Sequence, residues 1–202
     1  DLPRKSGLPA TEMWVRGRTL GGSSSINGMI YIRGQRQDYE TWAEHAGPDW
    51  GWDAMVRAYR SIEDHELGAD ELRGAGGPVH VSTGKFRYPL SEAMIRAGEQ
   101  MGLSRREDFN RECNEGVGYY AHTIRQGRRV SAAAAFLHPV RTRRNLQVLT
   151  GVQVDRVLFD GRRAVGVAAR REGESLSFRC RGEVILSAGA ILTPKILQLS
   201  GI

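Results

Sequence analysis

The sequence predicts a mixed α/β (or α+β) fold, and three patterns along the chain predict it. Apolar and aromatic residues recur at helical spacing in several segments of the first half. Between residues 152 and 178 the period changes to two, which is typical of half-buried strands. Residues 183–187 form an apolar run without alternation, as in a strand that is covered on both faces.

Three helices and two short strands are predicted in the first half. Apolar residues at intervals of three and four predict helices over Gln37–Ala46, Trp52–His65 and Ser91–Met101. A short strand is expected near Glu12–Val15, within an N-terminal loop. A second strand is expected at Val79–Ser82, after a glycine-rich break.

The large apolar residues of these helices are interpreted as packing residues. Trp42, Trp50 and Trp52 are expected in the core or between helices. Met94 and Met101 lie on the apolar side of the third helix, so we expect them in the core, without a cofactor role.

The second half predicts a meander, a buried strand and a helix. Tyr119–Ile124 and Leu146–Thr150 are expected to be strands, and Ser131 is expected to cap a short alanine-rich helix. Asp160-Gly161 separates two alternating segments, which is a hairpin signal, so we predict a three-stranded antiparallel meander. The unalternating apolar strand then leads into a helix over Ile191–Leu199.

The composition fits a soluble globular protein. The chain has 202 residues, of which 40% are hydrophobic and 26% charged. No apolar run approaches the roughly 20 residues of a membrane-spanning helix, and the first residues lack the apolar segment of a secretory signal. We therefore expect a cytoplasmic protein, without excluding peripheral membrane association. The sequence does not specify an oligomeric state.

Charge and metal-ligating residues argue against two other classes of protein. The net charge is +6, but the arginines are scattered among acidic residues, so no nucleic-acid partner is expected. Cys113 and Cys180 lie far apart, and the five histidines show no paired spacing. No metal site and no disulfide framework are expected.

The stretch Gly17–Ile30 has the most distinctive chemistry. Its glycine pair, Gly21-Gly22, lets another group approach the main chain, and the next three serines can cap a helix start with its amides directed outward. Such a helix start beside Arg18 suits a phosphate group. Glycine pairs also mark surface turns, so a plain turn before a short helix stays open as the alternative.

A second candidate ligand contact follows the apolar strand. Ser187, Ala188 and Gly189 form a small-residue turn at its C-terminal end, where α/β sheets commonly bind ligands. Small residues also favour an ordinary strand-to-helix turn, and the pattern does not separate the two interpretations.

The whole run Arg16–Gly34 resembles the N-terminal signature of the glucose–methanol–choline (GMC) flavoprotein oxidoreductases, most closely the choline and alcohol dehydrogenase branch. The similarity extends over essentially the whole chain. Further blocks that resemble the family, in the same order, are Gly116–Tyr120, Gly127–Leu137, Asn145–Gly151, Ala164–Val167 and Ile185–Ile202.

The resemblance implies FAD as cofactor and assigns residues to it in four groups. The pyrophosphate would lie against Arg18, Gly21, Gly22 and Ser23, and the flavin ring would lie near Asn27, Gly28, Met29 and Ile30. The main chain of Val154 would contact the adenine. The ADP portion would lie along Ser187, Ala188 and Gly189. Donors near the flavin ring would stabilise the reduced, anionic flavin. Some family oxidases attach FAD covalently through a histidine at the position of Ile26, so non-covalent FAD is expected here.

The resemblance also implies a fold and a division of the chain. It implies a partial FAD-binding Rossmann-like fold with a β-meander, plus the start of a substrate-binding domain. Residues 1–67 would be an FAD-binding segment, 68–140 part of the substrate-binding or cap region, and 141–202 an FAD-binding segment with the meander and the Ser-Ala-Gly-Ala turn.

The expected function is oxidation of the CH–OH group of a primary alcohol, choline-like or another small alcohol, by hydride transfer to flavin. The chain has no G-x-G-x-x-G run and no histidine in the family's catalytic motif, so we expect an internal piece of a longer protein and assign no catalytic residue. His122 and His138 are expected to be structural. The alternative is an inactive truncated fragment that is at most a partial nucleotide-binding module. The alcohol and the electron acceptor are not specified.

Overall fold

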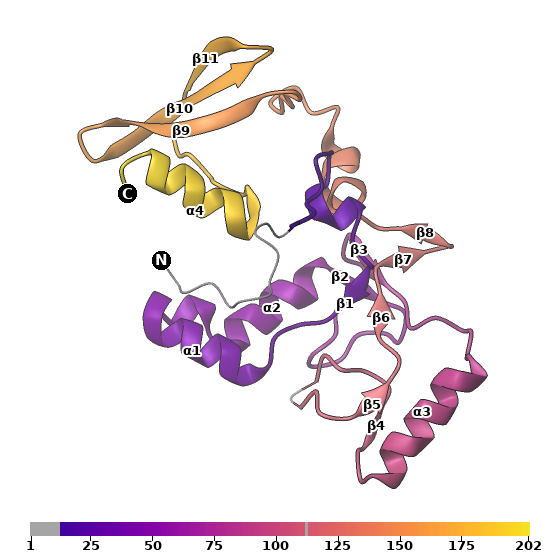
Figure 1. Cartoon of the computed structure of the whole chain (residues 1–202). Coiled ribbons are helices and arrows are strands. Elements are labelled where there is room, and N and C mark those ends of the chain that lie inside the picture. The colour runs from indigo at the N-terminus through magenta and orange to yellow at the C-terminus, as the bar shows by residue number, and fades with distance from the viewer. Residues whose placement is uncertain (1–12, 112) are drawn as a thin grey trace, which may run out of the picture. The chain divides into compact units, whose positions relative to one another are not determined.

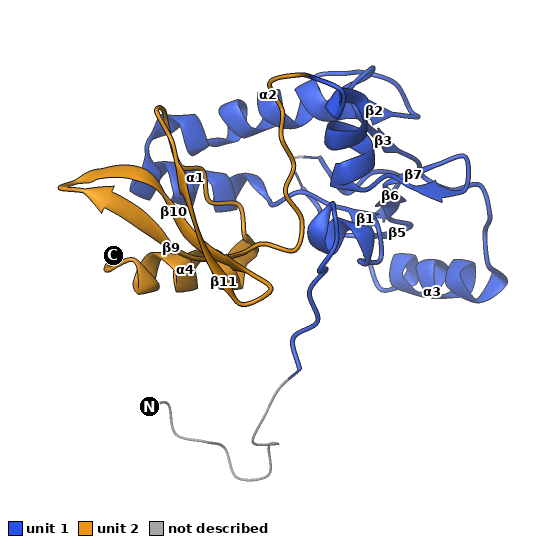
Figure 2. Ribbon diagram, turned by 90° about the horizontal axis from the view of Figure 1, so that it is seen from above, with its two compact units in different colours: residues 1–143 blue, residues 144–202 orange. Residues whose placement is uncertain are grey.

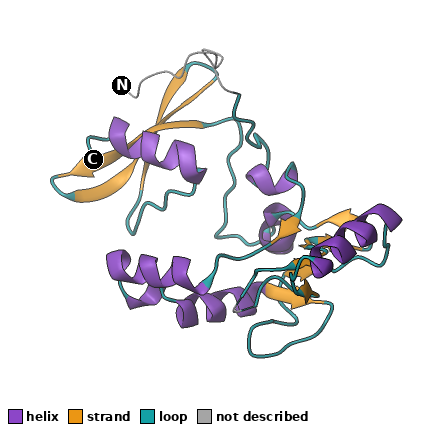
Figure 3. Cartoon of the chain, turned by 60° about the horizontal axis from the view of Figure 1, so that its bottom comes forward, coloured by secondary structure: helices purple, strands orange, loops and turns teal. Residues whose placement is uncertain are grey.

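The computed structural model describes residues 13–111 and 113–202, which fold as two compact units. Unit 1 comprises residues 1–143 and unit 2 residues 144–202 (Figure 2). The order of the elements along the chain can be followed in Figure 1. Both helices and strands occur in each unit (Figure 3), so the predicted mixed fold class is confirmed.

Unit 1 contains the helices α1, Arg36–Ala46, and α2, Trp52–Ile62, and their buried aromatic residues belong to one cluster. Tyr39 of α1 and Trp52 of α2 pack with ring centroids 5.9 Å apart, and Val56 completes this buried cluster. Helices are therefore confirmed at both predicted positions.

The remaining elements of unit 1 are short. The strands pair as β1 (Ile30–Tyr31) with β6 (Ala121–His122), β2 (Glu63–His65) with β3 (Val79–Val81), β4 (Arg105–Arg106) with β5 (Val117–Gly118), and β7 (Ile124–Arg125) with β8 (Arg128–Arg129). The other helical segments are η1 (Gly22–Ser25), η2 (Pro48–Trp50), α3 (Pro89–Gln100), η3 (Ala133–Leu137) and η4 (His138–Val140). The pairs β1–β6 and β7–β8 are antiparallel, whereas β2–β3 and β4–β5 are parallel.

A buried ion pair connects the segments of unit 1. Arg33 Nη2 donates to Glu63 Oε2 at 2.6 Å, and their side chains are 2% and 0% exposed. The same carboxylate oxygen accepts the amide N–H of Gly74, and Arg33 Nη1 donates to the Leu72 carbonyl. The Arg33 amide donates to Asn110 Oδ1 at 2.6 Å. Residues 33, 63, 72–74 and 110 are thus held together through charged and backbone hydrogen bonds.

Unit 2 is the predicted meander with one helix. The strands β9 (Gln153–Asp160), β10 (Arg163–Arg171) and β11 (Glu174–Arg179) pair antiparallel in the order β11-β10-β9. The helix α4, Gly189–Leu199, contacts β9. Ser200, which follows α4, accepts the amide N–H of Val157 on its hydroxyl at 2.8 Å. The predicted meander and final helix are confirmed.

Two predicted strands of unit 2 are wrong. Leu146–Thr150 and residues 183–187 form no regular secondary structure, and Ile185 is 81% exposed. An extended segment becomes a strand when a neighbour accepts and donates its backbone hydrogen bonds. In the described part of the chain, neither segment pairs with a strand.

Three predictions for unit 1 need correction. The helix predicted over Trp52–His65 ends at residue 62, because residues 63–65 pair with β3 instead. Tyr119–Ile124 is divided between two short strands. Met13–Val15 forms no strand, while Glu12 lies outside the described residues.

The packing roles of the large side chains were only partly predicted. Trp52 is buried, whereas Trp42 and Trp50 are about half exposed and pack edge-to-face on each other. Met94 and Met101 are 69% and 83% exposed, so their predicted core position is wrong. Ile95, one residue after Met94, and Gly98 are the buried residues of α3. Within the described residues, no helix is long and apolar enough to cross a bilayer.

The buried ion pair generates a stability prediction. Glu63→Ala should lower the free energy of unfolding by about 3–5 kcal/mol, because it leaves the Arg33 charge buried without a partner. Glu40→Ala removes the exposed Arg36–Glu40 pair of α1 and should cost at most about 0.5 kcal/mol. Urea denaturation of both variants measures the difference, and equal losses would contradict the assigned role of the buried pair.

Candidate cofactor site

The signature loop, Gly17–Ile30, is closed by its own serine hydroxyls. Ser23 Oγ accepts the Gly17 amide N–H at 3.2 Å, Ser24 Oγ donates to the Gly21 carbonyl at 2.5 Å, and Ser25 Oγ donates to the Leu20 carbonyl at 2.8 Å. The segment that follows Gly21 is a single 3-10 turn with no side-chain cap. Of the two interpretations that the sequence left open, the serine-capped helix start is therefore wrong, and the serines stabilise a compact turn.

Gly21 occupies a position that no other residue fits without strain. Its φ of +89° lies in the left-handed region. A Cβ there would fall 2.5 Å from Ser25 Oγ and 3.2 Å from Ala133 Cβ. The loop can therefore pack against the start of η3 only because position 21 lacks a side chain.

Residues 123–132 of unit 1 form hydrogen bonds to the signature loop. The Ala132 amide donates to Ser24 Oγ at 2.8 Å, and Arg129 Nη1 donates to the Ser24 carbonyl at 3.1 Å. Thr123 donates its amide N–H to the Met29 carbonyl at 2.9 Å. Sequence reasoning assigned no role to these residues. For Arg129 and Ala132, the signal that could have found them is the block Gly127–Leu137, which resembles the family. Thr123 lies outside this block.

The side chain of Asn27 is held at its oxygen. Asn27 Oδ1 accepts the Met29 amide N–H at 3.1 Å and Arg129 Nη1 at 2.7 Å. Met29 adopts a φ of +62°, which is uncommon for a residue with a side chain and is sustained by these bonds. The turn at residues 27–29 is therefore defined by its hydrogen bonds.

The outward side of the loop is open and rich in donors. A Cβ at Gly22 or Gly28 would meet no protein atom within 4 Å, so another molecule can approach the main chain there. Arg18 is exposed, and within the described residues it forms no ion pair. Such an arrangement can bind a negatively charged or hydrogen-bond-accepting ligand. It brings together all the unit 1 residues that were predicted to bind the cofactor.

The predicted residues of unit 2 lie on a strand and a turn. Val154 is half-buried on β9 and pairs with Ala169 of β10. Ser187 and Ala188 are exposed, and the Ala188 amide donates to Thr193 Oγ1 at 3.0 Å. Gly189 begins α4 with a φ of +88°. These four positions are local to unit 2, and their contact with a cofactor remains a prediction.

The histidines do not form a catalytic arrangement within the described residues. His122 lies on β6, and its main chain exchanges two hydrogen bonds with Ser82. Burial lowers the pKa of His65, whose Nδ1 accepts the Leu67 amide N–H. His80 Nδ1 lies 2.8 Å from Asp64 Oδ2, and that hydrogen bond is the main cause that lowers the pKa of Asp64. No cluster of metal-ligating residues is present among the described positions.

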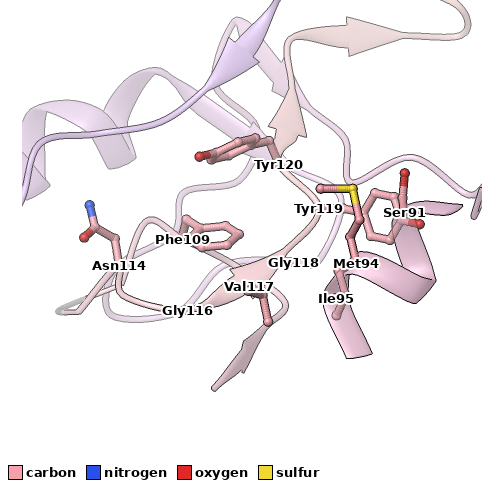
Figure 4. A pocket seen from close by; sticks show the side chains of 10 residues that line it. All are labelled: Ser91, Met94, Ile95, Phe109, Asn114, Gly116, Val117, Gly118, Tyr119 and Tyr120. Carbon is pink, nitrogen blue, oxygen red and sulfur yellow. The ribbon is translucent and has the colours of Figure 1, made fainter. Parts of the chain in front are cut away.

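A separate pocket lies between α3 and the segment that follows it. It has a volume of about 440 Å³, and its lining includes the apolar side chains of Met94, Ile95, Phe109 and Val117 (Figure 4). None of the residues predicted to bind the cofactor lines it. The pocket is thus distinct from the signature loop.

Comparison with known proteins identifies the family. The model of the GMC oxidoreductase family matches residues 8–202. The chain belongs to the GMC oxidoreductase family. Human mitochondrial choline dehydrogenase is 46% identical over 189 residues, which cover 94% of this chain and 32% of that protein. An alcohol dehydrogenase (acceptor) of Pseudomonas putida is 42% identical and covers 94% of the chain.

Solved structures agree with this assignment. Pyridoxine 4-oxidase from Mesorbium loti superposes with a TM-score of 0.88 at 38% identity, over 94% of this chain and 38% of that one. An FAD-dependent oxidoreductase from Chaetomium thermophilum gives a TM-score of 0.86 at 30% identity, over 93% of this chain and 35% of that one. The chain spans about a third of the length of the relatives that it matches. This family resemblance, predicted from the signature loop, is confirmed.

The two glycines of the loop should respond differently to substitution. Gly22→Ala should cost about 1 kcal/mol, the strain of a left-handed residue in open space. Gly21→Ala adds the contacts with Ser25 and Ala133 and should cost about 2 kcal/mol or more. Chemical denaturation gives both values. Equal losses would show that the loop does not pack against Ala133 as described.

Proposed function

We propose that this chain is part of an FAD-dependent oxidoreductase that oxidises the CH–OH group of a primary alcohol, either choline or another small alcohol. The observation that carries the proposal is the braced signature loop, which leaves its main chain open at Gly22 and Gly28. The names of the matched choline and alcohol dehydrogenases support this substrate class.

The residues of the loop fit FAD by their chemistry. Arg18, Gly21, Gly22 and Ser23 would hold the pyrophosphate, since an exposed guanidinium and bare main chain suit an anion. Asn27, Gly28, Met29 and Ile30 would face the flavin ring. In unit 2, Val154 would contact adenine and residues 187–189 the ADP portion, as the family resemblance implies.

Bound FAD would supply the hydride acceptor for alcohol oxidation. The chain's own contribution is to orient the cofactor and to place hydrogen-bond donors where negative charge develops on reduction. The Gly28 amide suits this role, because none of the described residues accepts a hydrogen bond from it. The proton of the alcohol hydroxyl would be removed by a base outside the residues assigned here.

The cofactor-binding proposal is tested by flavin spectroscopy. The full-length protein that carries this chain should be isolated yellow, and its flavin absorbance should bleach when choline or another primary alcohol is added without oxygen. A folded, colourless protein that takes up no FAD would exclude the proposal. Equilibrating the 202-residue chain alone with FAD tests the alternative, an inactive truncated fragment. A fragment without a complete site should quench flavin fluorescence weakly or not at all.

The mode of attachment is tested separately. Ile26 has no nucleophilic nitrogen, so we propose non-covalent binding at this position. Acid precipitation should release the FAD into the supernatant. Flavin that stays with the precipitated protein would show a covalent bond and would exclude this part of the proposal. An Ile26→Val variant is a suitable control, because it should release FAD in the same way.

A further inference from the structure

Arg129 reaches the signature loop from a tight hairpin. The strands β7 and β8 are joined by Gln126 and Gly127, both with positive φ, as a two-residue hairpin requires. The Arg129 side chain is directed to the loop and bonds to it at two acceptors, the Ser24 carbonyl and Asn27 Oδ1. The preceding Arg128 is exposed, and within the described residues its side chain forms no hydrogen bond.

The charge of Arg129 is not neutralised by a nearby acid. No carboxylate among the described residues lies within ion-pair distance of its guanidinium. The side chain is half-buried, where a charge interacts more strongly with its neighbours than it does in water. Both acceptors of its hydrogen bonds belong to the signature loop, so the Arg129 side chain stabilises the conformation of that loop.

The bonds to Asn27 determine which way its amide group faces. A guanidinium and a backbone N–H can only donate, so the atom that lies between Arg129 and the Met29 amide must be the oxygen. Both lone pairs of Oδ1 are then used. The NH2 group projects from the other branch of the amide, and none of the described residues accepts a hydrogen bond from it.

We propose that Arg129 is a positioning residue that holds the Asn27 amide with its two N–H donors directed toward the flavin. The inference rests on the proposed function, because it needs a flavin beside Asn27. Without Arg129, the amide loses its charged anchor and can rotate, so donors no longer face the negative charge that reduction creates. Arg129 therefore favours the reduced cofactor through Asn27.

The midpoint potential of the bound flavin tests this inference. In the full-length holoprotein, Arg129→Met should lower the equilibrium constant for two-electron reduction by about tenfold, equal to about 30 mV, measured against a reference dye. Arg128→Met, the same substitution one residue earlier in the hairpin, should leave the potential unchanged. In an Asn27→Ala background, Arg129→Met should have little further effect, because the group that it positions is gone.

Three results would overturn the inference. One is a flavin-loaded Arg129→Met protein with an unchanged potential. Another is a full-sized effect of Arg129→Met in the Asn27→Ala background, which would show that the charge acts without Asn27. If Arg129→Met does not fold, a crystal structure of the wild-type holoprotein decides, and Arg129 beyond hydrogen-bond distance of Asn27 contradicts the inference. A wild-type protein that binds no flavin would instead refute the proposed function.

Discussion

Arg33 lies two residues after β1, the strand that begins where the signature loop ends, and its side chain is almost completely removed from water. The Nε of Arg33 is buried without a hydrogen-bond partner among the described residues. Its charge is nevertheless paired, because Nη2 donates to Glu63 and Nη1 donates to the Leu72 carbonyl. These partners come from β2 and from the loop that follows it, while Asn110 holds the Arg33 amide. These bonds hold β2, the loop after it and the segment around Asn110 next to the end of the signature loop. Burial also raises the pKa of the adjacent Tyr31 to about 12, so its hydroxyl stays neutral.

The loop itself is shaped by contacts on its inner side and left open on its outer side. Serine hydroxyls close the turn, Gly21 lets it rest on Ala133, and Arg129 and Thr123 hold residues 24–29. A cofactor site benefits from this division, because groups that are already oriented need no rearrangement when charge develops on the ligand. The conformation of the loop therefore depends on residues about 100 positions later in the chain.

Unit 2 shows where local pattern is sufficient and where it is not. The meander satisfies its own backbone hydrogen bonds, and α4 contacts β9 while Ser200 bonds to Val157. Residues 183–187 have an equally strong apolar pattern, yet they remain unpaired and Ile185 is exposed. The pattern reports a preference for burial, whereas a strand also needs a partner for its backbone groups.

The sequence by itself determined the family, the mixed fold class, the helices α1 to α4 and the meander, because these follow from a signature and from periodic spacing within short segments. It also indicated the signature loop as the candidate cofactor site. The tertiary structure decided the rest: that the serines brace a turn, that Met94 is exposed, and that Arg129 anchors Asn27. These outcomes depend on contacts between residues far apart in the chain, and local periodicity carries no information about such contacts. Geometry in space, not spacing in sequence, determines which polar atom finds a partner.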